Sequence, residues 1–238
     1  MSRFWDMGSH KSKSTDNSAN SRSSANPAER TTMTRRTLIA LKTLVWSACL
    51  APFCWLVWGA FTNNLGPNAT GAIAYFTGRA TLRLLAITLA ISPLRRLIPR
   101  LAWLIRFRRL LGLFAFFYAT LHMLTWVALY NSFDLQAMVS DVARRRYITA
   151  GMAAYLSLLP LALTSTAWAI RKLGGKNWNR LHMLIYVAAI CGVAHYWWQM
   201  KPGVLTPLAM TVVIAALLLA RPILAWRQRQ KTRVTVGV

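Results

Sequence analysis

The sequence predicts an all-α membrane protein, built as a bundle of six transmembrane helices. The first observation is composition: 55% of the 238 residues are hydrophobic, and only five are Asp or Glu against 29 Lys and Arg. The second is that the apolar residues form runs of about 20, the length that crosses a hydrocarbon core of roughly 30 Å. The basic residues cluster between these runs instead of following an amphipathic face, which favours a membrane protein over a nucleic-acid binder.

Hydropathy places the six expected spans at 38–61, 78–97, 110–130, 147–170, 181–198 and 204–226. The second span is the weakest, because it contains Arg79 and Arg83. The fourth contains Pro160, which a transmembrane helix tolerates where its neighbours satisfy the freed carbonyl. The chain therefore divides into a disordered basic tail (1–34), a transmembrane domain (35–226) and a second basic tail (227–238).

The distribution of Lys and Arg predicts the orientation. Twenty-one of them lie in the two terminal tails and in the loops after the second and fourth spans. The opposite side holds only Arg144, Arg145, Arg146 and Lys201. Cytoplasmic segments of membrane proteins carry the excess of positive charge, so both termini are expected in the cytoplasm.

Three of the four histidines lie in the apolar runs, where ionisable side chains usually serve a function. The third and fifth spans run in the same direction, so a rise of 1.5 Å per residue places His122 roughly 18 Å and His195 roughly 21 Å above the inner boundary. Imidazole is a common axial ligand of haem iron, and this matched pair predicts a haem site. Hydrogen bonding between helices is the alternative. Proton relay and divalent-metal binding are disfavoured, because the spans contain no Asp or Glu.

His182 lies near the inner edge and has no histidine opposite it. A second, inner haem at His182 would place Arg108 or Arg109 near its propionates. Near the outer side, Arg79 and Arg83 are expected to bind the propionates of the outer haem or a flavin phosphate through bidentate hydrogen bonds. Their alternative role is to extend toward the lipid headgroups.

Eight short segments between residues 38 and 225 carry a resemblance to a known family. They are TGRATLR (77–83), SPLRR (92–96), RRLLG (108–112), YATLH (118–122), RYIT (146–149), LTST (163–166), WNRLH (178–182) and AHY (194–196). They resemble the MsrQ (YedZ) family, the haem-binding membrane subunits of a bacterial periplasmic methionine-sulfoxide reductase. This resemblance implies the ferric-reductase-like transmembrane fold, with His122, His182 and His195 as haem ligands.

The resemblance further implies an electron-transfer subunit of the bacterial inner membrane, distinct from the catalytic subunit of its complex. One or two b haems are expected, with FMN as a further candidate cofactor. The donor would be quinol or a cytosolic flavin reductase. The acceptor would be a periplasmic molybdopterin methionine-sulfoxide reductase that repairs oxidised proteins, docking near residues 131–146 and 196–203. Membrane lipid is an expected partner and nucleic acid is not.

Two alternatives remain open at this point. One is a ferric or cytochrome-b561-like transmembrane reductase that acts on small acceptors. The other is a haem-free six-helix transporter or scaffold that uses its histidines for packing. The chain has no Gly-rich dinucleotide fingerprint, so oxidation of NAD(P)H is not expected of it.

Overall fold

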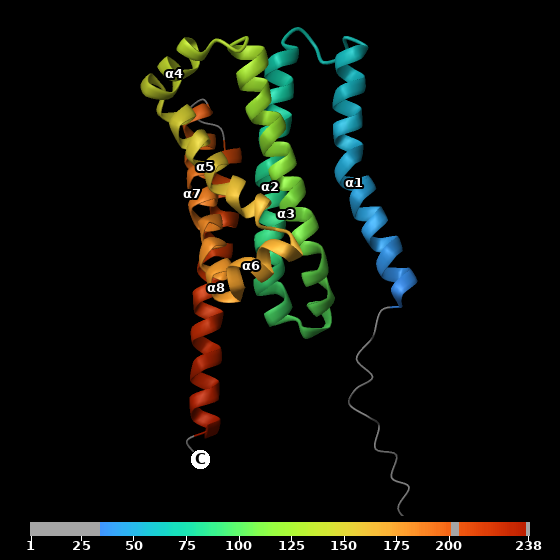
Figure 1. Ribbon diagram of the computed structural model, residues 1–238, viewed down its shortest axis with the longest axis vertical. Helices are drawn as coiled ribbons and strands as arrows, with labels where there is room; N and C mark the ends of the chain where they lie inside the picture. Colours follow the sequence, from blue (N-terminus) through green and yellow to red (C-terminus); the bar gives the residue numbers. More distant parts are fainter. Residues whose placement is uncertain (1–33, 201–204, 237–238) are drawn as a thin grey trace, which may run out of the picture. The chain divides into compact units, whose positions relative to one another are not determined.

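The computed structural model describes residues 34–200 and 205–236. The chain divides into two units, Met1–Leu41 and Lys42–Val238. Only residues 34–41 of the first unit are described, so the expected basic tail 1–34 lies almost wholly outside the described residues. The described residues are helical and contain no strand (Figure 1). The helices are α1 (Arg35–Phe61), α2 (Ala69–Leu97), η1 (Pro99–Leu104), α3 (Ile105–Leu124), η2 (Thr125–Tyr130), α4 (Leu135–Arg144), α5 (Arg146–Leu163), α6 (Ala167–Leu181), α7 (Leu184–Gln199) and α8 (Thr206–Val236).

The helix α2 forms the centre of the second unit. It lies beside α3 along much of its length and also contacts α7 and α8, while α5 packs against α7 (Figure 1). One face of α2 is buried in a core that includes residues from α3, α5, α7 and α8. The buried members of this core are Leu82, Leu85, Ala86, Leu89, Ala119, Leu158, Ala188, Ala189 and Ile214.

Four of the described helices are long and apolar enough to cross a membrane. They are α1, the continuous segment Pro99–Tyr130, α5 and residues Thr206–Leu224 of α8. The pair α6 and α7, bent by 43° at its break, would make a fifth. The helix α2, expected as the second span, is 29 residues long but is not among them, because Arg79 and Arg83 lower its hydropathy.

The outer surfaces of these helices are apolar. On α1, Trp55, Trp58 and Phe61 are 60%, 70% and 83% exposed. Contiguous exposed apolar surface of this extent is unfavourable in water and typical of helices that face lipid tails. The fold is therefore that of an all-α membrane protein, as the sequence predicts.

A hydrogen bond connects α1 to α3 inside this bundle. The hydroxyl of Tyr118, which is 1% exposed, donates to the carbonyl of Cys49 at 2.7 Å. Edge-to-face ring pairs lie on either side of this bond, between Trp46 and Phe114 and between Phe53 and Phe117. These contacts hold α1 against the helix that carries His122.

The helix boundaries differ from the expected spans in two places. The expected span 147–170 is interrupted, because α5 ends at Leu163 and Thr166 caps α6 by accepting a hydrogen bond from the Ala169 amide. The expected span 181–198 begins later, because α6 ends at Leu181 and α7 begins at Leu184.

The segment 131–146, expected as a loop, contains the short helix α4. Asp134 caps it by accepting hydrogen bonds from the amides of Gln136 and Ala137. At the other end of the chain, α8 continues through residues expected as a basic tail and ends at Val236.

Candidate functional site

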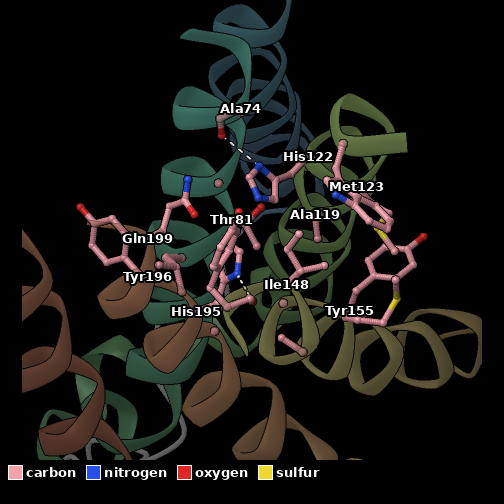
Figure 2. A pocket seen from close by; sticks show the side chains of 18 of the residues that line it. Ala74, Thr81, Ala119, His122, Met123, Ile148, Tyr155, His195, Tyr196 and Gln199 are labelled. Atoms are coloured by element: carbon pink, nitrogen blue, oxygen red, sulfur yellow. Dashed lines mark hydrogen bonds between the residues drawn. The ribbon is translucent and has the colours of Figure 1, made fainter. Parts of the chain in front are cut away.

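A cavity of about 430 Å³ lies between α2, α3, α5 and α7, and His122 and His195 both line it (Figure 2). The centroids of the two imidazole rings are 5.8 Å apart, and their planes are nearly perpendicular at 82°. The structure therefore brings together the two histidines that the sequence places at matched depth. The deeper walls of the cavity are mostly apolar and include Leu82, Ala119 and Leu158.

Both histidine rings are fixed in the same way. Nδ1 of His122 lies 2.9 Å from the carbonyl oxygen of Ala74, and Nδ1 of His195 lies 2.7 Å from that of Tyr147. A carbonyl oxygen only accepts, so each Nδ1 must carry the proton and donate it. Each Nε2 of the neutral ring is consequently left with a free lone pair, the form in which imidazole binds metals.

A glycine one helical turn after each carbonyl lets the ring approach. Gly78 follows Ala74 by four residues on α2, and Gly151 follows Tyr147 by four residues on α5. A Cβ added at Gly78 would lie 3.1 Å from Cε1 of His122. A Cβ added at Gly151 would lie 2.8 Å from Nδ1 of His195. The same arrangement therefore occurs twice. A backbone carbonyl accepts a hydrogen bond from the histidine, and a glycine four residues later packs against the imidazole ring.

Thr77 supports the first of these histidines. Its side chain is fully buried, and its hydroxyl donates to the carbonyl of Ile73 at 2.7 Å. The same hydroxyl oxygen lies 3.3 Å from Nδ1 of His122, where it can accept. The tautomer assigned to His122 thus satisfies both of its hydrogen-bonding neighbours.

Trp126 presents an unused hydrogen-bond donor at the cavity. It lies on η2, a π-helical turn that continues α3 beyond His122, and its side chain lines the cavity. The indole Nε1 is buried and has no partner among the described residues. Buried donors are nearly always paired, so this N–H indicates a missing acceptor. Single π-turns of this kind are frequent at functional sites.

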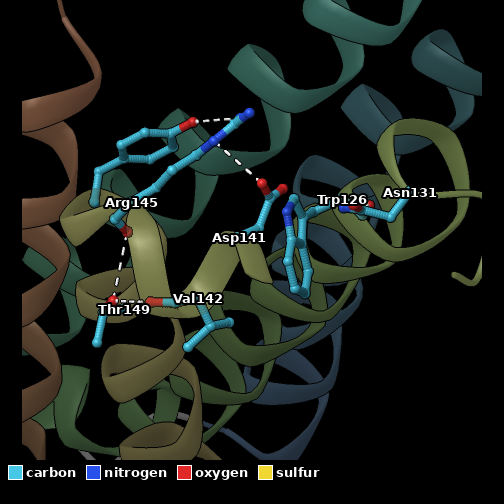
Figure 3. A network of polar contacts seen from close by, with 7 residues as sticks. Trp126, Asn131, Asp141, Val142, Arg145 and Thr149 are labelled. Atoms are coloured by element: carbon cyan, nitrogen blue, oxygen red, sulfur yellow. Dashed lines mark hydrogen bonds and ion pairs between the residues drawn. The ribbon is translucent and has the colours of Figure 1, made fainter. Parts of the chain in front are cut away.

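The polar rim of the cavity contains two arginines and one carboxylate. Arg79 donates to the hydroxyl of Tyr75. Nε of Arg145 lies 3.1 Å from Oδ1 of Asp141, and another of its nitrogens donates to the hydroxyl of Tyr147 at 3.2 Å (Figure 3). All five residues line the cavity, so its rim offers positive charge with one internal counter-charge.

The other residues predicted from the sequence lie elsewhere. Arg83 is exposed on α2 and is not among the residues that line this cavity. His182 lies in the break between α6 and α7, with its Nδ1 3.1 Å from the carbonyl of Trp178 and its ring 3.7 Å from the Trp178 ring centroid. Arg108 is half-buried near the start of α3, apart from the cavity.

Sequence reasoning missed several parts of the site. The sequence alone does not single out Trp126, and it places Arg145 only in the segment 131–146 that is expected to dock a partner. The two glycines were also missed, although the sequence holds a signal for them: each lies 44 residues before its histidine. That regularity has a structural meaning only when the helix pairing is known.

The cavity, its two histidines and the apolar helices around it define a class of membrane protein. Residues 77–193 match the model of the family described as ferric reductase like transmembrane component. His122 and most of the residues that line the cavity lie within this segment, and His195 lies two residues beyond its end. No solved structure matches the chain significantly.

Curated relatives identify the family more closely. A protein of Herminiimonas arsenicoxydans is 45% identical over 203 residues, covering 84% of this chain and 92% of the relative. One of Ralstonia nicotianae is 41% identical, covering 85% and 94%, and one of Caulobacter vibrioides is 41% identical, covering 79% and 87%. All three are named protein-methionine-sulfoxide reductase heme-binding subunit MsrQ. The chain belongs to the MsrQ family.

Proposed function

We propose that this protein is the haem-binding electron-transfer subunit of a methionine-sulfoxide reductase system. The observation that carries the proposal is the His122–His195 pair, two neutral imidazoles of defined tautomer in one membrane-embedded cavity. The relatives supply the chemical class, since their names state haem binding and the reductase system.

The residues of the cavity fit a haem in four respects. Each histidine has a free Nε2, and both rings line one cavity with their centroids 5.8 Å apart. Apolar side chains line the deeper walls. At the rim, Arg79 and Arg145 offer charge for carboxylates, and the Trp126 N–H lacks an acceptor. The propionates of haem b would supply such acceptors.

When bound, haem b supplies one-electron chemistry across the bilayer. His122 and His195 would hold it through their Nε2 atoms, and ligation by two histidines would favour electron transfer over oxygen chemistry. Ala74 and Tyr147 hold the two rings through their carbonyls and raise the basicity of the ligating nitrogens. The carbonyls of Ala74 and Tyr147, together with Gly78 and Gly151, fix the nearly perpendicular orientation of the two imidazole planes.

We further propose the route and the partners. Both termini lie in the cytoplasm, and the rim formed by Arg79, Asp141 and Arg145 lies at the periplasmic side of the inner membrane. Electrons arrive from the quinol pool or a cytosolic flavin reductase, with FMN as a further candidate cofactor. They leave at this rim to a docked periplasmic molybdopterin methionine-sulfoxide reductase of the MsrP type. The helix α4 and the end of α7 border the rim and supply its docking surface.

His182 remains a proposed ligand of a second haem. Its Nδ1 donates to the Trp178 carbonyl, so its Nε2 is free in the same way as those of the cavity pair. Apart from the cavity pair, the described residues offer no further histidine that would hold a haem together with His182, since His10 lies outside them. The structure thus favours the His122–His195 site over the inner one.

The test is electron delivery by the purified protein. Wild-type protein in nanodiscs is reduced anaerobically, and its haem spectrum is followed after the periplasmic reductase and methionine sulfoxide are added together. Reoxidation that needs both additions supports the proposal. Reoxidation by ferric citrate alone, with no effect of the periplasmic reductase, would support the ferric-reductase alternative instead.

A further inference from the structure

The short helix α4 and the turn before it carry large apolar side chains that the described residues leave exposed. Leu135 and Val139 on α4 are 74% and 70% exposed, and Phe133 in the turn is 68% exposed. Leu135 and Val139 are four residues apart, so they lie on one side of the helix. We call Phe133, Leu135 and Val139 the apolar edge of α4.

The chain holds α4 close to the membrane boundary. The apolar span that precedes α4 ends at Tyr130, and α5, the apolar span that follows it, begins at Arg146. Residues 131–134 connect α4 to the first of these spans, and Arg145 alone separates it from the second (Figure 1). Both spans therefore meet the segment 131–145 at one end of the bundle. A helix of ten residues is roughly 15 Å long, so α4 with such short connections cannot lie far from the bilayer.

The contacts between α4 and α5 use other residues of α4. The hydroxyl of Thr149 on α5 donates to the carbonyl of Val142 at 2.6 Å (Figure 3). Asp141 pairs with Arg145, the residue that links the two helices, at 3.1 Å. Val142 is partly buried, whereas the apolar edge is not. The apolar side of α4 is thus wider than its contact with α5, and the apolar edge is the uncovered part.

The backbone is strained where the apolar edge begins. The φ angle is 47° at Ser132 and 65° at Phe133, in the left-handed region that glycine normally occupies. A bulky residue in this region is uncommon and energetically unfavourable. Backbone hydrogen bonds close the turn, from the Phe133 amide to the Val127 carbonyl and from the Asp134 amide to the Asn131 carbonyl. A phenylalanine that is both strained and exposed indicates that its ring is covered from outside the described chain.

The apolar edge also continues a surface that faces lipid tails. Leu124, Leu129 and Tyr130, in the last turns of the preceding span, are 49%, 51% and 57% exposed. The sequence from Leu124 to Phe133 contains no charged residue. Acyl chains that cover this end of the span are therefore the nearest apolar material for the apolar edge, and they identify lipid as its occupant.

We propose that α4 is an interfacial helix whose apolar edge is inserted among the lipid acyl chains of the adjacent leaflet. Amphipathic helices of this kind lie in the membrane plane and bury apolar side chains at the boundary between headgroups and acyl chains. Asp141 follows Leu135 by six residues, roughly 240° around the helix, so insertion leaves Asp141 on the polar side with Arg145 at the cavity rim. Lipid thus holds one side of the rim in place. The inference depends neither on the proposed electron-transfer function nor on which side of the membrane α4 occupies.

Nitroxide labels on α4 test the proposal. Single cysteines replace Leu135, Val139 or Arg144 in full-length protein whose three native cysteines are changed to alanine, reconstituted alone in phosphatidylcholine nanodiscs. Arg144 is the matched control, because it is exposed and follows Leu135 by nine residues, which places it on the opposite side of the helix. Leu219, 61% exposed within the α8 span, is the lipid-facing reference.

The measurement compares collisions of each label with O₂, which concentrates in the bilayer, and with a nickel complex that stays in water. We expect the ratio of O₂ to nickel collisions at Leu135 and Val139 to be several-fold higher than at Arg144 and to approach the ratio at Leu219. Ratios at Leu135 and Val139 equal to that at Arg144 would overturn the proposal and leave the apolar edge free for a docked protein. Shielding of both labels from both reagents would also overturn it, because it would indicate contact with a second copy of the chain.

A charge on the apolar edge gives a second test that keeps the native cysteines. Val139→Glu should lower Tm in the same nanodiscs by about 2 °C or more, because the carboxylate disfavours insertion into the bilayer. Gln136→Glu adds the same charge at an exposed polar position of α4 and should keep the Tm of the wild type. If the cysteine-free protein does not fold, this pair decides the outcome. An unchanged Tm in Val139→Glu would then overturn the proposal, since a side chain that already faces water tolerates the charge.

Discussion

His122 and His195 meet across the cavity with their ring centroids 5.8 Å apart, although they lie on different helices and 73 positions apart in the chain. Each ring donates from Nδ1 to a carbonyl of a third or fourth helix, so each is held by a hydrogen bond as well as by packing. Four helices therefore determine the geometry of two nitrogen atoms. The predictions below concern this arrangement and the fold that maintains it.

Replacement of Gly151 by alanine should disturb His195. The added Cβ would lie 2.8 Å from Nδ1, so the ring must move away from the Tyr147 carbonyl. We expect overpacking to cost about 1–3 kcal/mol and haem content per protein to fall. The pyridine haemochrome assay and thermal unfolding measure the two effects. Gly112→Ala is the matched control on α3, because its Cβ would meet Thr88 at an ordinary 3.7 Å; equal haem loss in both variants would contradict the role given to Gly151.

Replacement of Trp126 by phenylalanine should leave haem bound but change its electronics. The variant removes the orphan Nε1–H while keeping an aromatic ring in the cavity wall. Loss of a donor to a propionate leaves more negative charge near the iron, which disfavours the reduced state. The midpoint potential is expected to fall by tens of millivolts, on the order of one hydrogen bond to a charged group. An unchanged potential in spectroelectrochemical titration would show that Trp126 does not contact the cofactor.

The bond between Tyr118 and Cys49 should contribute to stability without affecting the haem. Tyr118→Phe removes the hydroxyl but keeps the buried ring, so the Cys49 carbonyl loses this donor. A cost of about 0.5–1.5 kcal/mol is expected in thermal unfolding, with an unchanged visible spectrum. Tyr130→Phe, at a residue 57% exposed, should not change the stability, and it is the control for that measurement alone because Tyr130 lines the cavity. A spectral change in Tyr118→Phe would mean that α1 also shapes the cavity.

The orientation is testable with fusions of known topology dependence. Alkaline phosphatase inserted between Asn131 and Ser132 should be active, because α4 is expected on the periplasmic side. A fluorescent protein that folds only in the cytoplasm should be fluorescent at the C-terminus. The reverse pattern would overturn the assignment of the Arg79–Arg145 rim to the periplasm.

Parts of this architecture follow from sequence because their physical causes are local. Long apolar runs make spans, and a constant rise per residue places His122 and His195 at one level. The breaks at Thr164–Thr166 and at His182 could not be predicted, because helix ends inside apolar sequence depend on capping and tertiary contacts. Asp134 caps the start of α4, which is a local cause. Hydropathy nevertheless does not reveal this helix, because ten amphipathic residues between two spans have too weak a signal to be recognised as a separate helix.

The site residues also divide into those that the sequence alone indicates and those that depend on tertiary contacts. Histidines inside spans are conspicuous because they are costly there. Gly78, Gly151 and Trp126 are ordinary in a membrane helix, and their role appears only when a neighbouring helix is in place. Arg221 also lies within an apolar span, and only its hydrogen bond to the Leu89 carbonyl shows that it faces inward.

The central claim is that His122 and His195 hold one low-spin b haem between them. The reduced-minus-oxidised visible spectrum of the purified protein tests it most directly, for the wild type and for the single variants His122→Ala, His195→Ala and His182→Ala. The account predicts a low-spin b-type band in the wild type that disappears in the first two variants and persists in His182→Ala. A colourless, folded wild-type protein from haem-replete cells, or a band that survives the loss of both cavity histidines, would contradict it.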